Sequence, residues 1–508
     1  MSRRPNILFI TSDQQRGDCY GFEGRPVRTP HLDMLASEGT RFAACITPNV
    51  VCQPSRASIL TGLLPRTHGV ADNGIDLPPE AAETGFAATL ARGGYRTGFV
   101  GKAHFATSHT FARTGTPECR HSMQEYDESW FGPYMGFEHV ELVVEGHNHW
   151  PPLEPPSGQH YERWYHGDGR GALKNELYAT RLAPDVGAPQ TWHSALPTAW
   201  HNSTWIGNQT IAYIERHADE PFCLWASFPD PHHPFDAPDP WSRMHDPDEV
   251  DLPVHRTLDL ERRPWWHRAS LENKPSIRQD LAAIRENYSR IKTIDDLHLR
   301  HVIANYFGMI SLIDHNVGRI LASLDALGLA DDTIVVFSTD HGDWLGDHGL
   351  ILKGPMHYEG LLRVGCIMRG PGVPAGQVVQ DPVSTLDLAA TFHDYAGVSP
   401  ARELNSRSLR GLVEGRETRD FAYNEWALNA SRCGVALELR TVRTRTHKMT
   451  VDLNSGAGEL YHLAEDPHEM ENLYEDPGHA AVRRELREMI EARPDDALSH
   501  PLSPVGMA

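Results

Sequence analysis

The 508-residue sequence has little of three things: cysteine, long apolar runs and positive charge. Its seven cysteines lie far apart without CxxC or zinc-finger spacing, so a disulfide framework is not expected. No stretch approaches the ~20 apolar residues of a membrane span. The apolar run from Ile7 to Ile10 behind Arg3 and Arg4 is too short for a signal peptide. We therefore expect a cytoplasmic protein with no membrane segment.

The charge balance is acidic. The chain has 47 Lys and Arg residues against 68 Asp and Glu residues, which gives a formal net charge of −21 with neutral histidines. A protein that binds nucleic acid or an anionic membrane needs a basic face, so neither partner is expected. The same charge would also disfavour an anionic substrate. Hydrophobic residues make up 40% and charged residues 23% of the chain, which is typical of globular domains.

Apolar runs that alternate with helical patterns indicate an α/β fold. Strands are predicted at Asn6–Thr11, Tyr95–Val100, Phe222–Phe228 and Thr333–Phe337. Helices are predicted to begin at Pro30, with Thr29 as N-cap, and to extend from Val302 to Leu324. This alternation predicts a mostly parallel sheet sandwiched by helices, and ligands bind such sheets at the carboxyl ends of the strands.

Two stretches interrupt this alternation. Residues from about 105 to 200 and from about 236 to 275 are rich in Pro, Gly, His and Trp, and we expect them to be loop insertions over the site. After about residue 400 the pattern changes to short apolar runs, at Phe421–Trp426, Val435–Val442 and His447–Leu453, and a final charged helix near Ala480 to Ala492. We predict a catalytic α/β domain over residues 1–400 and a smaller α+β domain over residues 405–508. Its tail from Pro494 could reach a neighbouring subunit of a homo-oligomer.

The sharpest motif is Cys52-Gln-Pro-Ser-Arg56-Ala-Ser-Ile-Leu-Thr-Gly62. It resembles in full the sulfatase signature C-x-P-S-R-x-x-x-L-T-G, and a chance match in a chain of this length is expected only about once in a million. The resemblance implies an alkaline-phosphatase-like fold and a maturation enzyme that oxidises Cys52 to formylglycine. The hydrated aldehyde would offer one hydroxyl to attack sulfur and a second to collapse and expel sulfate. Arg56 is implied to hold the oxygen of this nucleophile.

A hydrated aldehyde is a weak nucleophile, so a cation is expected beside it. Asp13 and Gln14 end the first predicted strand, and Asp340 and His341 end a later one. With Cys52, these residues match the family's metal-ligand positions. Other sulfatases often carry a second Asp and an Asn where this chain has Gln14 and His341, and the departure resembles phosphonate monoester hydrolases of the same superfamily. Oxygen ligands favour Ca²⁺ or Mg²⁺, whereas the imidazole shifts the preference toward Mn²⁺.

Two further segments resemble sulfatase motifs. The segment from Gly94 to His104 implies that Lys102 contacts the sulfate oxygens and that His104 is the general base that collapses the intermediate. This pair favours sulfate, because phosphonate monoester hydrolases carry uncharged Tyr and Thr there. The segment Pro-Asp-Pro-His232-His-Pro resembles the family's P-H-x-P sequence, so His232 is the candidate to protonate the leaving alcohol.

Three other residues are candidates for contact with the substrate. Lys353 matches a sulfate-binding lysine that follows the Asp-His-Gly segment. Asn73 is a weaker candidate for an oxygen contact. His201 is the third, although it could instead orient a loop or helix. The segment from Leu460 to Leu473 looks like the family's closing segment, so the resemblance covers nearly the entire chain.

The sequence therefore predicts a sulfatase that hydrolyses small, aryl-sulfate-like monoesters through a metal-bound formylglycine hydrate. Two alternatives remain open: a phosphonate monoester or phosphodiester hydrolase with the same site, and a catalytically silent protein that binds sulfated ligands. The local charge favours an anion despite the net charge, because a divalent cation and three basic side chains outnumber two carboxylates. The acidic exterior should still disfavour polyanionic substrates such as sulfated polysaccharides.

Overall fold

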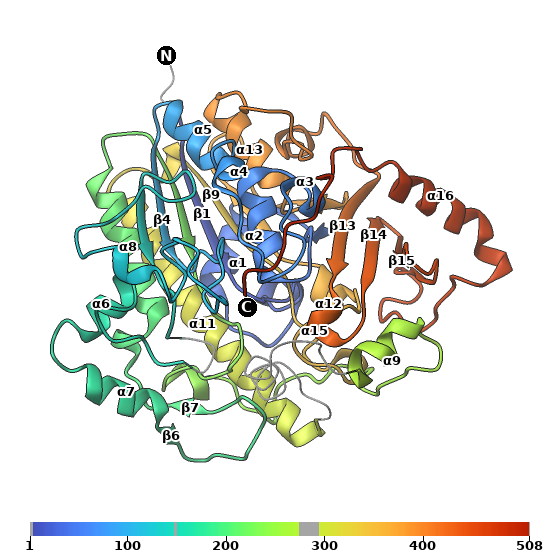
Figure 1. Ribbon diagram of the computed structural model, residues 1–508, viewed down its shortest axis with the longest axis horizontal. Helices are drawn as coiled ribbons and strands as arrows, with labels where there is room; N and C mark the ends of the chain where they lie inside the picture. Colours follow the sequence, from blue (N-terminus) through green and yellow to red (C-terminus); the bar gives the residue numbers. More distant parts are fainter. Residues whose placement is uncertain (1–3, 147–149, 274–293, 507–508) are drawn as a thin grey trace.

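The computed structural model describes residues 4–146, 150–273 and 294–506. Residues 147–149 and 274–275 of the two expected insertions, and the last two residues of the tail, lie outside the described residues. An eight-stranded sheet has the order β11-β2-β10-β9-β1-β8-β4-β5 (Figure 1). The strands are β1 (Asn6–Ser12), β2 (Thr40–Phe42), β4 (Arg96–Gly101), β5 (His139–Leu142), β8 (Phe222–Ser227), β9 (Thr333–Thr339), β10 (Cys366–Arg369) and β11 (Gln377–Val379).

The first strand of the chain lies at the centre of this sheet. β1 pairs in parallel with β8 on one side and with β9 on the other, and β8 pairs in parallel with β4, which pairs with β5. Only β10 is antiparallel to its neighbours, β9 and β2. Every residue of β1 is buried, as its continuous apolar sequence predicts. The mostly parallel sheet is confirmed.

Helices cover both faces of the sheet. Ile7 and Phe9 of β1 face one hydrophobic core, and Leu8 and Ile10 face the other. The first core includes residues of α2 (Cys52–Thr61), α5 (Phe86–Arg92) and α13 (Asp387–Ala396). The second includes residues of α1 (Pro30–Ser37), α8 (Asn202–Arg216) and α11 (Asp296–Ala326). The predicted sandwich of helices around one sheet is therefore the observed architecture.

Thr29 is the N-cap residue of α1 and Pro30 begins the helix, as predicted, but the structure differs from the predicted helices in two details. The Thr29 side chain does not cap α1; the backbone N–H groups of His31 and Leu32 donate to Asp314 of α11 instead, at 3.3 and 2.8 Å. The helix predicted from Val302 begins earlier, because Asp295 accepts from the N–H of His298 and caps α11. α11 has 31 residues, yet no helix in the described ranges is both long and apolar enough to cross a membrane.

The stretch from 105 to 200 is not loop throughout. It contains β5, which extends the main sheet, and two helices, α6 (His160–His166) and α7 (Gly171–Ala179). The stretch from 236 carries α9 (Trp265–Glu272). The remaining short elements are β3 (Cys45–Ile46), α3 (Pro65–His68), α4 (Pro79–Ala82), β6 (Arg181–Leu182), β7 (His193–Ser194), α12 (Glu359–Leu362), β12 (Val383–Ser384), α14 (Arg410–Val413) and α15 (Ala430–Cys433).

A second, antiparallel sheet follows the catalytic core. It consists of β13 (Phe421–Leu428), β14 (Leu437–Thr444), β15 (His447–Asp452) and β16 (Gly458–His462), of which the sequence did not predict β16. Helix α16 (Ala480–Glu491) packs on this sheet through Leu486 and Ile490 (Figure 1). This is the small α+β unit that the sequence predicts.

The tail after α16 returns to the catalytic core of its own chain. The Leu498 N–H donates to the carbonyl of Arg66, and the Val505 N–H donates to the carbonyl of Gly74, at 2.9 and 2.8 Å. Leu502 packs against the first hydrophobic core. These contacts hold the tail against its own chain, and a contact with a neighbouring subunit stays a prediction.

A buried carboxylate joins the two sheets. Glu425 of β13 is 1% exposed and accepts from Arg440 at 3.0 Å, from Arg493 at 2.7 Å and from the backbone N–H of Arg66 at 2.7 Å. These donors come from the small sheet, the tail and α3 of the catalytic core. Glu425 therefore connects three parts of the chain that are distant in sequence.

Glu425→Gln should strongly destabilise the protein, because it removes the negative charge that compensates two largely buried arginines. We expect a loss of about 3 kcal/mol in the free energy of unfolding, measured by denaturant titration at neutral pH. Glu438→Gln is the matched control, since Glu438 pairs with Arg66 and Arg440 but is 16% exposed and should cost about 1 kcal/mol or less. Equal losses in the two variants would contradict the assigned role of Glu425.

Candidate active site

The predicted site residues gather where four neighbouring strands end. Asp13 follows β1, Asp340 follows β9, Lys102 follows β4 and Ser227 is the last residue of β8. Because β9, β1, β8 and β4 are adjacent and parallel, their carboxyl ends lie together at one edge of the sheet. Cys52, the first residue of α2, reaches the same edge, since its sulfur lies 3.8 Å from Asp13 Oδ1.

Arg56 joins all four strand ends. Its guanidinium is fully buried and donates from Nε to Asp340 Oδ2 at 2.8 Å and from Nη2 to Asp13 Oδ2 at 3.3 Å. Nη1 donates to the Lys102 carbonyl at 2.7 Å and to Ser227 Oγ at 2.8 Å. These bonds use four of the five guanidinium N–H groups. One N–H on Nη2 has no partner among the described residues and is the one that could contact the oxygen of a nucleophile.

The Cys52 sulfur is surrounded by basic groups. It lies 3.1 Å from His341 Nε2 and 3.1 Å from Lys353 Nζ, and its proximity raises the pKa of His104 against the effect of burial. Burial raises the pKa of the Cys52 thiol, and so does Asp13. Interactions with Lys353, His341 and Lys102 outweigh both and hold that pKa well below its usual value. Residue 52 therefore occupies a pocket that stabilises negative charge on its side chain.

The expected metal ligands also lie together. Asp13, Cys52, Asp340 and His341 each offer one atom, and these four atoms lie within 4.8 Å of one another. His341 Nδ1 donates to the carbonyl of Gly342 at 2.9 Å, which leaves Nε2 to face the cluster. Gln14 donates to Asp343 at 2.6 Å, while its buried Oε1 has no hydrogen-bond partner among the described residues. This buried acceptor and the donor set fit a divalent cation.

Two lysines complete the charge balance. Lys102 Nζ lies 2.6 Å from Asp13 Oδ2. Burial lowers the pKa of Lys102, but interactions with Asp13, Cys52 and Asp340 together outweigh burial and raise that pKa, so the ammonium stays charged. Lys353 Nζ lies 3.0 Å from His232 Nε2, 3.3 Å from His341 Nε2 and 3.1 Å from the Cys52 sulfur, so it links the predicted proton donor His232 to Cys52. The strand ends thus combine positive charge with two histidines that can transfer protons.

The two weaker candidates have structural partners. Asn73 Oδ1 accepts from the N–H of Gln53 at 2.9 Å in the first turn of α2. His201 accepts from the N–H of Ser203 at 3.2 Å and caps α8. The sequence had already raised this second role for His201, and a contact of either residue with the substrate stays a prediction.

Sequence reasoning missed Glu118, which fixes the loop that carries His104. Its carboxylate accepts from the backbone N–H groups of His104, Phe105 and Ala106 at 2.6 to 3.1 Å. These bonds hold His104 in a left-handed conformation with φ of 50°. Glu118 lies within the stretch that we expected to be a loop insertion, and its single acidic side chain gives no sequence signal.

Arg16 was missed as well. It is 6% exposed and donates to the carbonyls of Asp343 and Trp344 at 3.2 and 2.6 Å, and to the carboxylates of Asp18 and Asp347. These bonds tie the loop after β1 to the loop after β9. The sequence offered one hint of this role: Arg16 lies three residues after Asp13, close to the end of the first predicted strand.

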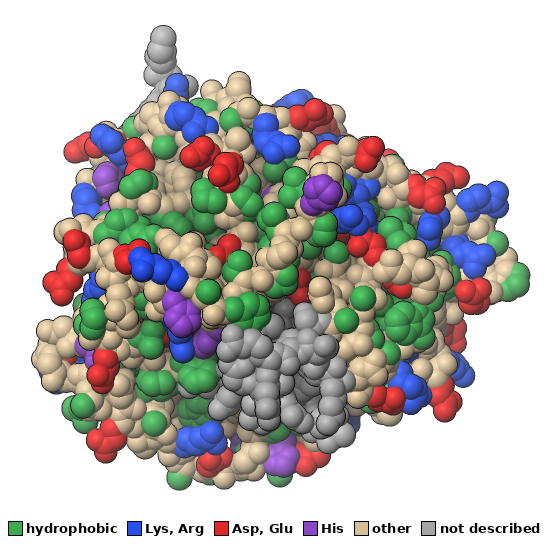
Figure 2. All heavy atoms as spheres, in the orientation of Figure 1, with side chains coloured by type: hydrophobic (Ala, Val, Ile, Leu, Met, Phe, Trp, Pro, Cys, Tyr) green, Lys and Arg blue, Asp and Glu red, His purple; other side chains and the backbone are tan. Residues whose placement is uncertain are grey.

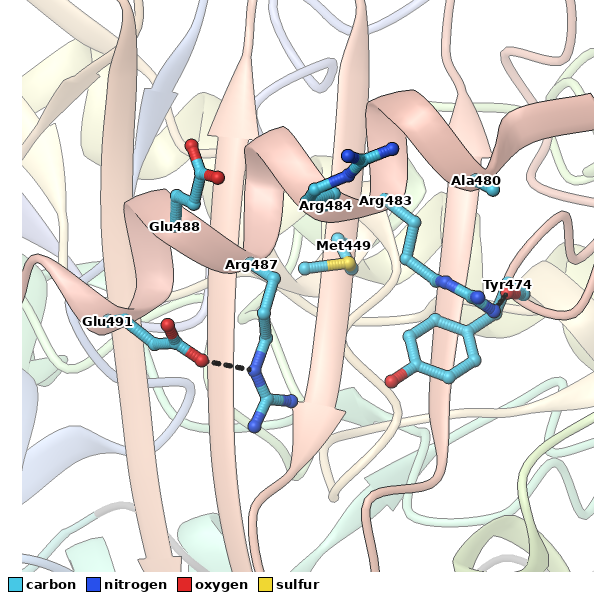
Figure 3. Close-up of a pocket in the computed structure, with 8 residues that line it drawn as sticks. All are labelled: Met449, Tyr474, Ala480, Arg483, Arg484, Arg487, Glu488 and Glu491. Carbon is cyan, nitrogen blue, oxygen red and sulfur yellow. Dashed lines mark hydrogen bonds and ion pairs between the residues drawn. The ribbon is translucent and has the colours of Figure 1, made fainter.

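A separate hollow lies beside α16. Figure 3 shows it lined by Met449, Tyr474, Ala480, Arg483, Arg484, Arg487, Glu488 and Glu491. Its charges are mixed, and Arg487 pairs with Glu491 at 3.0 Å. In Figure 1, α16 lies at the right margin, away from the α2 helix that carries Cys52. None of the predicted site residues lines this hollow, which therefore is not the active site.

Comparisons with known proteins agree with this geometry. A family model described as Sulfatase matches residues 5–398, and one described as N-sulphoglucosamine sulphohydrolase, C-terminal, matches residues 346–495. An arylsulfatase of Clostridium perfringens is 28% identical over 480 residues, which cover 92% of this chain and 90% of the relative. The multifunctional alkaline phosphatase superfamily protein PehA of Trinickia caryophylli is 27% identical, with 95% and 93% covered.

A solved structure of a known hydrolase has the same fold as this chain. The phosphonate monoester hydrolase of Agrobacterium radiobacter superposes with a TM-score of 0.75 at 25% identity, covering 96% of this chain and 95% of its own. The Sulfatase model spans the whole eight-stranded sheet, and the full signature begins at Cys52. The chain therefore belongs to the sulfatase family and has the alkaline-phosphatase-like fold.

Proposed function

We propose that this sulfatase hydrolyses small monosulfate esters of the aryl-sulfate type. The observation that carries the proposal is the position of Cys52, within 3.1 Å of both Lys353 and His341 and at the centre of a buried, positively charged site. A singly charged, tetrahedral sulfate ester needs such a site, because its charge must be stabilised as the bond to the alcohol breaks. The mixed charges over the face in Figure 2 give no continuous basic track for a polyanion.

Two groups that the chain would acquire complete the site. Oxidation of Cys52 to formylglycine by a maturation enzyme would supply a hydrated aldehyde as nucleophile in place of the thiol. A divalent cation, Ca²⁺ or Mn²⁺ before Mg²⁺, would be held by Asp13, Gln14, Asp340 and His341 and would lower the pKa of that nucleophile. The imidazole of His341 is the reason to include Mn²⁺.

The chain's own residues would bind the transferred group and move the protons. Lys102 and Lys353 would bind the oxygens of the transferred group, while Arg56 holds both metal-binding carboxylates and keeps one N–H for the oxygen on residue 52. His232 would donate a proton to the leaving alcohol. Burial lowers the pKa of His104 to about 4, so its imidazole is neutral at pH 7 and can accept a proton from residue 52.

A phosphonate monoester or phosphodiester hydrolase is the second candidate function. Two observations favour it: the ligand pair Gln14 and His341, and the fold match to a phosphonate monoester hydrolase. The pair of Lys102 and His104 favours sulfate, because phosphonate monoester hydrolases carry uncharged Tyr and Thr at these positions. We therefore propose sulfate as the preferred substrate and the phosphonate as a slower one.

Cys52→Ala should lower turnover of an aryl sulfate by about 10⁴-fold or more, because it removes the nucleophile. Wild-type protein from a host with the maturation enzyme should show, by mass analysis of the Cys52 peptide, a carbonyl oxygen in place of sulfur. Cys119→Ser is the control, since Cys119 is also buried but bonds with Thr110, and it should keep activity. An unmodified thiol in that protein would favour a silent binder of sulfated ligands.

The substrate preference can be measured directly. The ratio of kcat/KM for 4-nitrophenyl sulfate to that for the matching aryl phosphonate monoester should exceed one in the wild type. Both substrates carry one negative charge, so the ratio reports the site rather than the net charge. A ratio well below one would support the phosphonate hydrolase instead.

The two histidines should respond differently to the leaving group. His232→Ala should cost about 10²- to 10⁴-fold in kcat/KM for a poorly leaving alkyl sulfate, and much less for 4-nitrophenyl sulfate, which needs no proton to leave. His104→Ala should release alcohol faster than sulfate in the first turnover, whichever alcohol leaves. Rapid-quench assays of both products test this, and the opposite pattern would exchange the two roles.

A further inference from the structure

We propose that, before conversion, when residue 52 is still cysteine, this site binds a thiophilic divalent cation, with Zn²⁺ as the expected ion. The ligands would be the Cys52 thiolate, His341 Nε2 and one oxygen each of Asp13 and Asp340. Conversion of Cys52 would then change the metal preference of the site toward hard cations. This last step rests on the proposed function, whereas the zinc site rests on the geometry of the chain as it is encoded.

The distances between the four ligand atoms suit a tetrahedral ion. The Cys52 sulfur lies 3.1 Å from His341 Nε2 and 3.8 Å from Asp13 Oδ1. His341 Nε2 lies 3.8 Å from Asp13 Oδ1 and 3.9 Å from Asp340 Oδ1. Zn–S bonds of about 2.3 Å and Zn–N or Zn–O bonds of about 2.0 Å place tetrahedral ligands roughly 3.3–3.6 Å apart. The remaining pairs lie within 4.8 Å of each other, so closing the site around zinc would take shifts of up to about 1 Å.

Neighbouring groups already orient these ligands. The Gly342 carbonyl fixes the ring of His341 with Nε2 toward the sulfur. Lys102 and Arg56 bind Asp13 Oδ2, which leaves Oδ1 facing Cys52. Arg56 likewise binds Asp340 Oδ2. Asp340 Oδ1 accepts from the backbone N–H groups of Gln14 and His341 at 3.1 and 3.0 Å, so these bonds fix its position but share the atom that would bind the ion. Asp13 and His341 are held by groups that bind a different atom of each side chain.

One group must move for the ion to enter. Lys353 Nζ lies 3.1 Å from the Cys52 sulfur and 3.3 Å from His341 Nε2, so it borders the place that the cation would take. The Lys353 side chain is partly exposed and long enough to swing toward solvent. Zinc would then replace the ammonium as the positive charge beside the thiolate.

The chemistry of the donors explains why conversion should matter. A thiolate with an imidazole and two carboxylates is a donor set that Zn²⁺ binds well, whereas Ca²⁺ and Mg²⁺ prefer oxygen. A hydrated aldehyde offers oxygen in place of sulfur and, when neutral, removes one negative charge from the ligands. The unconverted chain should therefore select zinc over calcium, and the converted chain should lose that selectivity.

Cobalt titration of the unconverted protein tests the proposal. The full chain is produced in a host without the maturation enzyme, its thiol is verified by intact mass, and bound metal is removed with a chelator. Co²⁺ should then produce a near-ultraviolet thiolate-to-cobalt charge-transfer band and visible bands of tetrahedral Co²⁺. Stoichiometric Zn²⁺ should abolish these bands, whereas excess Ca²⁺ should leave them.

Two cysteine variants show which thiolate produces the charge-transfer band. Cys52→Ser should remove the charge-transfer band and weaken Zn²⁺ binding by ~10-fold or more, since a hydroxyl replaces the thiolate. Cys119→Ser should keep both, and circular dichroism should show that both variants are folded. Absence of the band in the wild type, or its persistence in Cys52→Ser, would overturn the proposal. Failure to hydrolyse sulfate esters after conversion would instead count against the proposed function, because that assay uses the converted protein.

Discussion

One buried guanidinium determines how the site is built. Arg56 reaches the ends of β9, β1, β4 and β8 at once, and four of its five N–H groups are used in doing so. The two carboxylates that it binds would otherwise repel each other in a region of low dielectric. Their neutralisation by Arg56 and Lys102 allows two aspartates to lie within a few ångströms of Cys52, and Lys353 then leaves an excess of positive charge among the side chains around it.

The small sheet also holds the segment that precedes Cys52. The Glu425 N–H donates to the carbonyl of Pro48, and Asn49 Nδ2 donates back to the Glu425 carbonyl, at 3.1 and 2.7 Å. Thr47 in turn donates to the carbonyl of Asp340 at 2.6 Å. The segment that precedes Cys52 is therefore held between β13 and the loop that carries two of the metal-binding residues. The C-terminal unit is a structural part of the active site rather than an appendage.

The sequence was informative where chemistry follows a buried strand. Asp13, Lys102, His232 and Asp340 each follow an apolar run, so the parallel sheet and the gathering of these residues could be predicted together. Contacts between distant, individually unremarkable residues could not. Asp314 caps α1 in place of Thr29, Glu118 organises the loop of His104 from within an apparent insertion, and β5 and β16 have no distinctive pattern. Such partners are selected by tertiary packing, which local periodicity does not record.

The central position of β1 sets the order in which the site can be completed during synthesis. β1 and α2 leave the ribosome early, but their partners β8 and β9 follow much later, and Asp340 and His341 are the last of the proposed metal ligands to be made. At roughly 5–20 residues per second, the interval between Cys52 and Asp340 is roughly 15–60 s. Residue 52 is buried in the finished fold. A modifying enzyme would therefore find residue 52 accessible during that interval. Slower translation of the chain between Cys52 and Asp340 would lengthen the time available for modification.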